Sequence, residues 1–304
     1  MIKEVLEKTE ALEEKIQALL AEEEKTEEIR VLQEEKKKLL DSCKDLEPGD
    51  RVFLARHPRR PHVEDFVSAL FTDFFEQKGD HLYDEDRSIY GGIARFHGRP
   101  VTVLGHRKGR TVEENLSYNF GMTCPEGYRK AKRLMEQAEK FDRPIITFVD
   151  TPGAYPGLEA EQHGQGEAIA KNLAFMSSLH VPVIAVVTGE GSSGGALGIC
   201  VANKILMLEN AIYSVLSPEG FATILWKDSS RAAEAAKVMK LTAKDLKEAN
   251  VADEVVPESL GGAQDDPESL YKALDQTLEK TLAYYEGMSR HEIRKDRLSK
   301  FRNI

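Results

Sequence analysis

Two short runs of β-branched apolar residues constrain the fold of this chain most strongly. Ile145–Val149 and Val183–Val187 each have the composition of a buried strand, and a helical pattern follows each run before the next one begins. Strands that alternate with helices pair in parallel, because a helical crossover returns the chain to the same end of the sheet. The sequence therefore predicts an α/β fold built on a mainly parallel sheet.

Other segments of the chain extend this scheme. A turn at His97–Pro100 predicts a hairpin between two alternating runs, because it contains both Gly and Pro. The further expected elements are strands at Arg51–Ala55, Ile89–Phe96, Val101–His106 and Ile205–Leu208, and helices over Val63–Lys78, from Pro125 onward, and around Ile169, Leu173, Met176 and Leu179.

Composition divides the chain into three segments. Residues 1–47 are rich in Glu, Lys and Leu, and contain neither Gly nor Pro. They predict one long amphipathic helix, or a helical hairpin that breaks near Glu24–Thr26. Such a segment either packs on its own domain or offers a seam to a second chain, and both interpretations stay open. Residues 48–260 form the expected α/β domain, and residues 261–304 a helical tail whose basic run, Arg290 to Arg302, predicts a solvated face or a frayed end.

Charge and cysteine content exclude several classes of protein. The 304 residues include 42 Lys and Arg against 52 Asp and Glu, a net charge of -10, which argues against a general nucleic-acid or membrane-surface binder. Apolar runs such as Val181–Val187 are far shorter than the roughly 20 residues that cross a bilayer. Cys43, Cys124 and Cys200 are too few and too widely spaced for a disulfide framework or a cysteine zinc site. The N-terminus lacks the apolar core of a signal peptide. We expect a cytoplasmic protein without a metal ion of its own.

The densest motif is the glycine-rich stretch Thr188–Ala196, which follows the strand Val183–Val187 and precedes a short helix beginning near Gly194. Glycines leave backbone N–H groups uncovered, and a helix start adds N–H groups without intrahelical partners. The stretch therefore predicts a turn that binds an anion, a phosphate or a developing oxyanion.

Two short patterns compete for this stretch. Gly189, Gly191 and Gly194 match the dinucleotide-binding pattern G-x-G-x-x-G, although only residues 195–203 are left for the following helix. Ser193 lies at the centre of G-x-S-x-G, the pattern of serine hydrolases. A hydrolase would need a triad of unusual order that draws on His163 or His180.

A second glycine-bearing loop favours a third interpretation. Asp150–Gly157 follows the strand Ile145–Val149, so two successive parallel strands end in such loops at the same edge of the sheet. Two facing sets of N–H donors would form a hole for a thioester or ureido oxygen, and an enolate needs that stabilisation without a side-chain nucleophile.

Several long motifs together resemble one family, the α subunits of the bacterial acetyl-CoA carboxylase carboxyltransferase. These motifs are Asp150–Gly157, Gly189–Gly198, Ser214–Lys227 and Leu241–Pro257, and the charged helical N-terminus is similar as well. The resemblance covers nearly the whole chain. It implies a crotonase-like fold, a spiral of β-β-α units, with an N-terminal helical extension and a helical tail.

The resemblance also implies an activity and its partners. The family transfers a carboxyl group from carboxybiotin on the biotin carboxyl carrier protein to acetyl-CoA, giving malonyl-CoA in the first committed step of fatty acid biosynthesis. The α subunit works with a zinc-bearing β subunit in an α2β2 heterotetramer, and ATP is used only by the separate biotin carboxylase. In this family the carboxybiotin releases CO2, its ureido nitrogen takes the α-proton of acetyl-CoA, and the enolate attacks CO2.

The resemblance assigns roles to residues of both loops. Gly194 and Gly195 are expected to donate backbone hydrogen bonds to the carboxybiotin carbonyl. Gly153, Ala154, Gly191 and Ser193 are expected to line the carboxybiotin pocket. Alternatives that remain open are transfer to another acyl-CoA, a crotonase-fold hydratase or serine hydrolase, and a scaffold whose partner performs all the chemistry.

The substitution Ser193→Ala separates two of these alternatives. A carboxyltransferase whose donors are backbone N–H groups should keep most of its activity, whereas a serine hydrolase should lose nearly all of it. Assays of carboxyl transfer and of ester hydrolysis on the variant and the parent chain decide between them. Loss of carboxyl transfer in the alanine variant would contradict the backbone-donor interpretation.

Overall fold

The computed structural model describes residues 2–21 and 26–303. Its centre is an eight-stranded mixed sheet in the order β1-β2-β3-β4-β5-β6-β8, with β7 beside the end of β5. The strands are β1 Thr72–Glu76, β2 Ile89–Phe96, β3 Arg99–His106, β4 Ile145–Thr151, β5 Val183–Ser192, β6 Lys204–Leu208, β7 Ile212–Ser214 and β8 Glu254–Val256. β1 to β3 pair antiparallel, whereas the pairs from β3 to β8, and β5 with β7, are parallel. The expected mainly parallel α/β architecture is confirmed.

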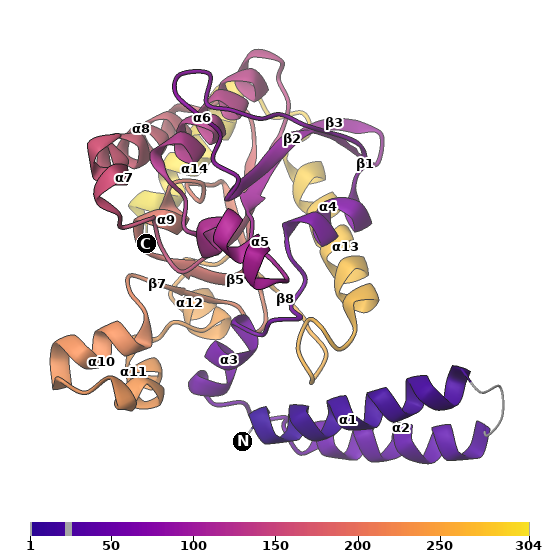
Figure 1. The fold of residues 1–304 in the computed structure, drawn as a ribbon. Coiled ribbons are helices and arrows are strands. Elements are labelled where there is room, and N and C mark those ends of the chain that lie inside the picture. The colour runs from indigo at the N-terminus through magenta and orange to yellow at the C-terminus, as the bar shows by residue number, and fades with distance from the viewer. Residues whose placement is uncertain (1, 22–25, 304) are drawn as a thin grey trace.

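Helices cover both faces of the sheet (Figure 1). The central ones are α4 Val63–Leu70, α6 Pro125–Lys140, α8 Gln165–Ser178, α9 Ser193–Leu197, α13 Pro267–Tyr285 and α14 Arg290–Arg302. The outer ones are α1 Ile2–Ala21, α2 Thr26–Asp41, α3 Pro48–Ala55, α5 Val112–Ser117, η1 Asn119–Gly121, α7 Leu158–Gln162, α10 Pro218–Trp226, η2 Ser229–Arg231, α11 Ala232–Met239 and α12 Ala243–Glu248. α6 and α8 pack together on one face, and α4 packs with α13 on the other.

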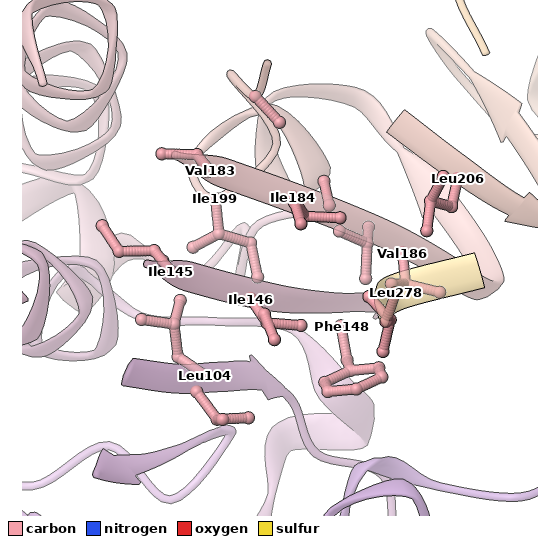
Figure 2. Packing of buried hydrophobic residues seen from close by; sticks show 14 of the residues in the cluster. Leu104, Ile145, Ile146, Phe148, Val183, Ile184, Val186, Ile199, Leu206 and Leu278 are labelled. Atoms are coloured by element: carbon pink, nitrogen blue, oxygen red, sulfur yellow. The ribbon is translucent and has the colours of Figure 1, made fainter. Parts of the chain in front are cut away.

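β4 and β5 form the centre of the core because every residue of both strands is buried. Figure 2 shows Ile146 and Ile184 on these neighbouring strands, with Phe148 toward Leu278 of α13. The ring of Phe148 also stacks on Phe66 of α4, with 5.3 Å between centroids. A strand buried on both faces is apolar throughout rather than alternating, which explains why these two runs stand out in the sequence.

The N-terminal segment forms a helical hairpin, one of the two expected forms. α1 and α2 pack against each other and extend along one end of the molecule (Figure 1). The expected break near Glu24–Thr26 falls mainly on residues 22–25, which lie outside the described residues. The hairpin packs on its own chain, since Ile2 and Leu6 share a buried cluster with Leu54 of α3.

Two sequence-based assignments were wrong. Arg51–Ala55 belongs to the helix α3 and not to a strand, because Pro48 starts the helix and the Asp50 carboxylate accepts a hydrogen bond from the Glu47 backbone N–H. Val63–Lys78 is not one helix: α4 ends at Leu70, and β1 then adds an edge strand to β2. Short apolar runs without clear periodicity fit either element. The helix start at Pro48 decided the first case, and the pairing of β1 with β2 decided the second.

The basic tail is also not simply solvated. Arg297 of α14 is completely buried, and its guanidinium donates hydrogen bonds to the carbonyls of Met176, Leu179 and Val181 at 2.7–3.0 Å and to Asn203 Oδ1. Burial lowers the pKa of Arg297 to about 10, so the group stays charged at neutral pH. This side chain thus closes the C-terminal end of α8 and fixes α14 on the core.

Replacing Arg297 by Met should destabilise the fold by about 3 kcal/mol or more, because three buried carbonyls lose their donor. Lys295→Met is the matched control, since Lys295 is exposed on the same helix. Chemical denaturation of both variants measures the difference. Equal stability of the two variants would contradict the role assigned to Arg297.

Candidate active site

Two loops meet at the carboxyl edge of the sheet, where β4 leads to α7 and β5 leads directly into α9. Gly195 of α9 lies against the backbone of the other loop: a Cβ placed on Gly195 would be 2.5 Å from Ala154 N and 2.5 Å from Gly153 C. Such a distance is far below any van der Waals contact, so only glycine fits at this position. The two loops are therefore in direct backbone contact at the edge where the sequence predicted them to lie.

The start of α9 presents backbone donors beside this contact. Ser192 is extended, and α9 begins at Ser193, which has a left-handed φ of 58°. The first N–H groups of a helix have no intrahelical acceptor and carry a partial positive charge. Gly194 is half-buried, and a Cβ placed on it would find its nearest neighbour, Ile169 Cδ1, at an ordinary 3.7 Å. A methyl-sized group therefore fits at Gly194, in ordinary contact with Ile169.

In the loop that follows β4, Gly153 has a φ of 148°, and a Cβ placed on it would have no neighbouring atom within 4 Å. Its N–H already donates to Thr151 Oγ1 at 3.1 Å. Gly153 thus shapes an open stretch of loop, and its own N–H is engaged. Ala154, half-buried, is the residue of this loop whose backbone N faces Gly195 most closely.

The glycines before Ser192 lie in a strand and not in the expected turn. Residues 188–192 continue β5 and do not form a turn, so Gly191 is a buried strand residue. A Cβ on Gly191 would lie 2.4 Å from the ring of Tyr213, and one on Gly189 would lie 2.4 Å from Asp150 Oδ1. Both glycines make room for packing within the protein, which corrects the sequence-based picture of a single glycine-rich turn.

A buried ion-pair network underlies the two loops. Lys108, just after β3, places its Nζ 2.7 Å from Asp150 Oδ1 and 3.6 Å from Glu190 Oε2. Asp150 Oδ1 also accepts the Glu190 backbone N–H at 2.9 Å. Together these contacts tie the ends of β3, β4 and β5 at the point where the β4–β5 register shifts between Val149 and Thr151.

Charge pairing keeps Asp150 and Lys108 ionised. Burial alone would raise the pKa of Asp150, but the Lys108 ammonium and the Glu190 N–H outweigh it and hold the pKa below its usual range. Burial alone would lower the pKa of Lys108, and the Asp150 and Glu190 carboxylates raise it instead. Sequence reasoning missed this network, although charged residues that end otherwise apolar strands are a signal for it.

Beside the network lies a cavity of about 220 Å³. Its charged and imidazole lining consists of Arg56, His57, Arg60, His62, Lys108, Arg110 and Asp150. The cations are paired with carboxylates around the cavity: Arg56 with Glu190 and Glu219, for example, each at 2.7 Å. The cavity is therefore polar and nearly balanced in charge.

The hydrolase and dinucleotide interpretations find no support in this geometry. Among the described residues, no histidine hydrogen-bonds to Ser193, which is exposed. The Nδ1 atoms of His163 and His180 lie 3.0 Å from Glu126 and Glu139 instead. His106 is fully buried, and burial lowers its pKa to about 4. A dinucleotide turn is excluded because Gly189 and Gly191 lie within β5.

Metal ligands and membrane spans were sought over the described ranges, residues 2–21 and 26–303. There, no group of three or more His, Cys, Asp or Glu side chains is arranged to hold a metal ion. Over the same part of the chain, no helix is both long and apolar enough to cross a bilayer.

Solved structures of low sequence identity share this fold. The transcarboxylase 12S core with methylmalonyl-coenzyme A aligns with a TM-score of 0.57 at 20% identity, over 72% of this chain and 42% of that chain. The β subunit of P. aeruginosa geranyl-CoA carboxylase gives 0.56 at 16% identity over 74% and 42%. A Pseudomonas malonate decarboxylase hetero-tetramer with coenzyme A gives 0.57 at 17% over 69% and 84%. The chain thus spans less than half the length of the first two proteins. The expected crotonase-like fold is confirmed.

Closer relatives are found by sequence. The carboxyl transferase subunit alpha of acetyl-coenzyme A carboxylase from Bacillus cereus is 53% identical over 280 residues, which are 92% of this chain and 86% of that protein. The Bacillus subtilis subunit of the same name is 54% identical over 278 residues, 91% and 86% of the two chains. The family model described as acetyl co-enzyme A carboxylase carboxyltransferase-like matches residues 2–304. The chain therefore belongs to the acetyl-CoA carboxylase carboxyltransferase family, on the side of its α subunits.

Proposed function

We propose that this chain is the α subunit of an acetyl-CoA carboxylase carboxyltransferase, and that it supplies the carboxybiotin side of a shared active site. The product of the reaction is malonyl-CoA. The observation that carries the proposal is the backbone contact of Gly195 with Gly153 and Ala154, beside the open N-terminus of α9. The high identity to relatives named as such α subunits supports the choice of acetyl-CoA as acceptor.

The N–H groups of Gly194 and Gly195 are the proposed donors to the ureido carbonyl of carboxybiotin. Preorganised donors of this kind stabilise negative charge as it develops, and they need no reorganisation during the reaction. When bound, carboxybiotin supplies the carboxyl group that is transferred to acetyl-CoA. Gly153 and Ala154 form the facing wall, and Ser193, exposed at the rim, contacts the ligand through its backbone turn rather than as a nucleophile.

The ion-pair network has a supporting role in this proposal. Lys108 holds Asp150, and Asp150 holds the Glu190 backbone, so the loop after β4 and the end of β5 keep a fixed relative position. A donor displaced by as little as about 1 Å loses much of its effect on rate. The network therefore preserves donor geometry without touching the substrate.

The proposal includes partner proteins, a cytoplasmic location and no resident metal. Exposed apolar side chains lie around the site: Leu158 of α7 is 75% exposed, Leu197 of α9 38% and Val215 after β7 79%. Apolar surface beside a reaction centre is typical of a protein interface. We assign it to a zinc-bearing β subunit in an α2β2 assembly, which would bring acetyl-CoA. The biotin carboxyl carrier protein would deliver carboxybiotin, and biotin carboxylase alone would consume ATP.

Gly194→Val should lower carboxyl transfer about a hundredfold or more, the size of effect seen when one oxyanion donor is lost. The reason is that a Cβ at Gly194 makes only ordinary contacts, so we expect the valine side chain to enter the ligand's position without separating the two loops. The rate of biotin-dependent malonyl-CoA decarboxylation by the assembled enzyme measures the effect.

Gly166→Val is the matched control, because Gly166 lies in the first turn of α8 with no atom within 4 Å of its Cβ position. Gly195→Val is unsuitable, since its side chain would force the two loops apart. Full activity of Gly194→Val, with the control equally active, would refute the donor assignment.

A reconstitution experiment tests the shared site. Malonyl-CoA and a biotin derivative are incubated with this chain alone, with a zinc-bearing β subunit alone, and with both. We expect acetyl-CoA only from the mixture. Activity of this chain by itself would contradict the two-subunit site, and a silent mixture would reject the proposed function.

A further inference from the structure

We infer that three buried polar side chains, Gln165, Asn172 and Tyr128, act as positioning residues that hold the two loops of the site in register. The inference rests on the proposed function and deepens it. None of the three is expected to touch the substrate, because Gln165 is 4% exposed and the other two are completely buried. Their contacts reach both loops from behind.

Gln165 holds the loop that follows β4. Its Nε2 donates to the carbonyls of Thr123 and Tyr155, at 2.8 and 3.0 Å. Tyr155 directly follows Ala154, and its own N–H donates to Thr123 O at 3.1 Å. One carboxamide thus fixes the segment that contains the proposed wall of the carboxybiotin pocket.

Asn172 holds α9 in the same way. Its Nδ2 donates to the carbonyls of Tyr128 and Gly198, both at 3.0 Å. Asn172 and Gln165 are seven residues apart on α8, which places them on one face of that helix. The same face of α8 therefore carries one amide for each loop.

Tyr128 of α6 completes the arrangement. Its hydroxyl donates to Gly195 O at 3.2 Å, and a Cβ on Gly198 would lie 2.5 Å from the Tyr128 ring. The ring packs against Gly198 and limits how closely α9 approaches α6. The hydroxyl holds the carbonyl of Gly195, the residue that contacts Gly153 and Ala154. Because α6 and α8 pack directly together, the three side chains form one rigid support.

Both amides use their NH2 groups to reach the loops. Gln165 Oε1 and Asn172 Oδ1 are buried and accept no hydrogen bond within the described residues. Each amide therefore leaves one polar atom unsatisfied while its NH2 group serves two carbonyls.

Two variants test the inference in the complex with the β subunit. Tyr128→Phe removes one hydroxyl, and Gln165→Met removes one amide of similar size. We expect each variant to lower kcat for biotin-dependent malonyl-CoA decarboxylation about tenfold, and to leave KM for malonyl-CoA within about twofold, because that substrate is proposed to bind the β subunit.

Matched controls separate positioning from general stability. Tyr285→Phe removes a hydroxyl that donates a hydrogen bond to Asp296 at 2.8 Å. Gln264→Met removes an amide that donates a hydrogen bond to Gly261 O at 2.7 Å. Like Gln165, Gln264 has a buried amide oxygen without a partner among the described residues. Both lie on the C-terminal segment, and their kcat should equal that of the parent enzyme. Equal losses in controls and variants, or unchanged kcat in the variants, would overturn the inference.

Amide hydrogen exchange on the full-length chain gives a readout that does not depend on activity. Tyr128→Phe should accelerate exchange in residues 193–198, and Gln165→Met in residues 152–157, while the two controls change neither segment. Unchanged exchange in the variants would overturn the inference even if the reconstituted parent enzyme is active. If exchange changes in the variants but the parent chain with the β subunit is inactive, the proposed function is rejected. The inference that these side chains position the loops is then still supported.

Discussion

The parallel pairing of β4 with β5 is the constraint on which the rest of the structure depends. Both strands are buried along their whole length and are paired on both sides, so neither can shift without disrupting the close packing of the core. That register runs from Ile145 against Val183 to Val149 against Val187 and then shifts, with Thr151 opposite Gly191. The carboxyl ends of the two strands therefore lie at the same edge of the sheet, which brings the loops that follow them into contact.

Glycine serves three distinct purposes within a few residues of this edge. Gly189 and Gly191 make room inside the protein for the Asp150 carboxylate and the Tyr213 ring. Gly195 permits one backbone to touch another, and Gly194 leaves space beside a helix start. A motif search treats these positions as one pattern, yet only the last two adjoin the proposed ligand. This explains why the dinucleotide and hydrolase patterns matched the letters of the sequence but not its geometry.

The sequence predicts much of the fold and part of the site. Apolar runs such as Ile145–Val149 could be assigned to strands because a strand buried on both faces has a distinct composition. The position of the loops that follow these strands could be predicted from their parallel pairing. Arg51–Ala55 was assigned to the wrong element because five residues carry little periodic signal and the helix start at Pro48 decided the outcome. Lys108 and Arg297 could not be placed at all, because each has a partner far along the chain, 42 and 121 residues away. Contacts of that kind exist only after the strands have docked.

The buried network of Lys108, Asp150 and Glu190 makes the site depend on the sheet beneath it. Its members come from three strand ends, 42 and 40 residues apart along the chain, so they meet only where β3, β4 and β5 are paired. The loop contacts that they secure therefore depend on the pairing of all three strands. Competence for the proposed reaction thus depends on the paired centre of the sheet and not on either loop alone.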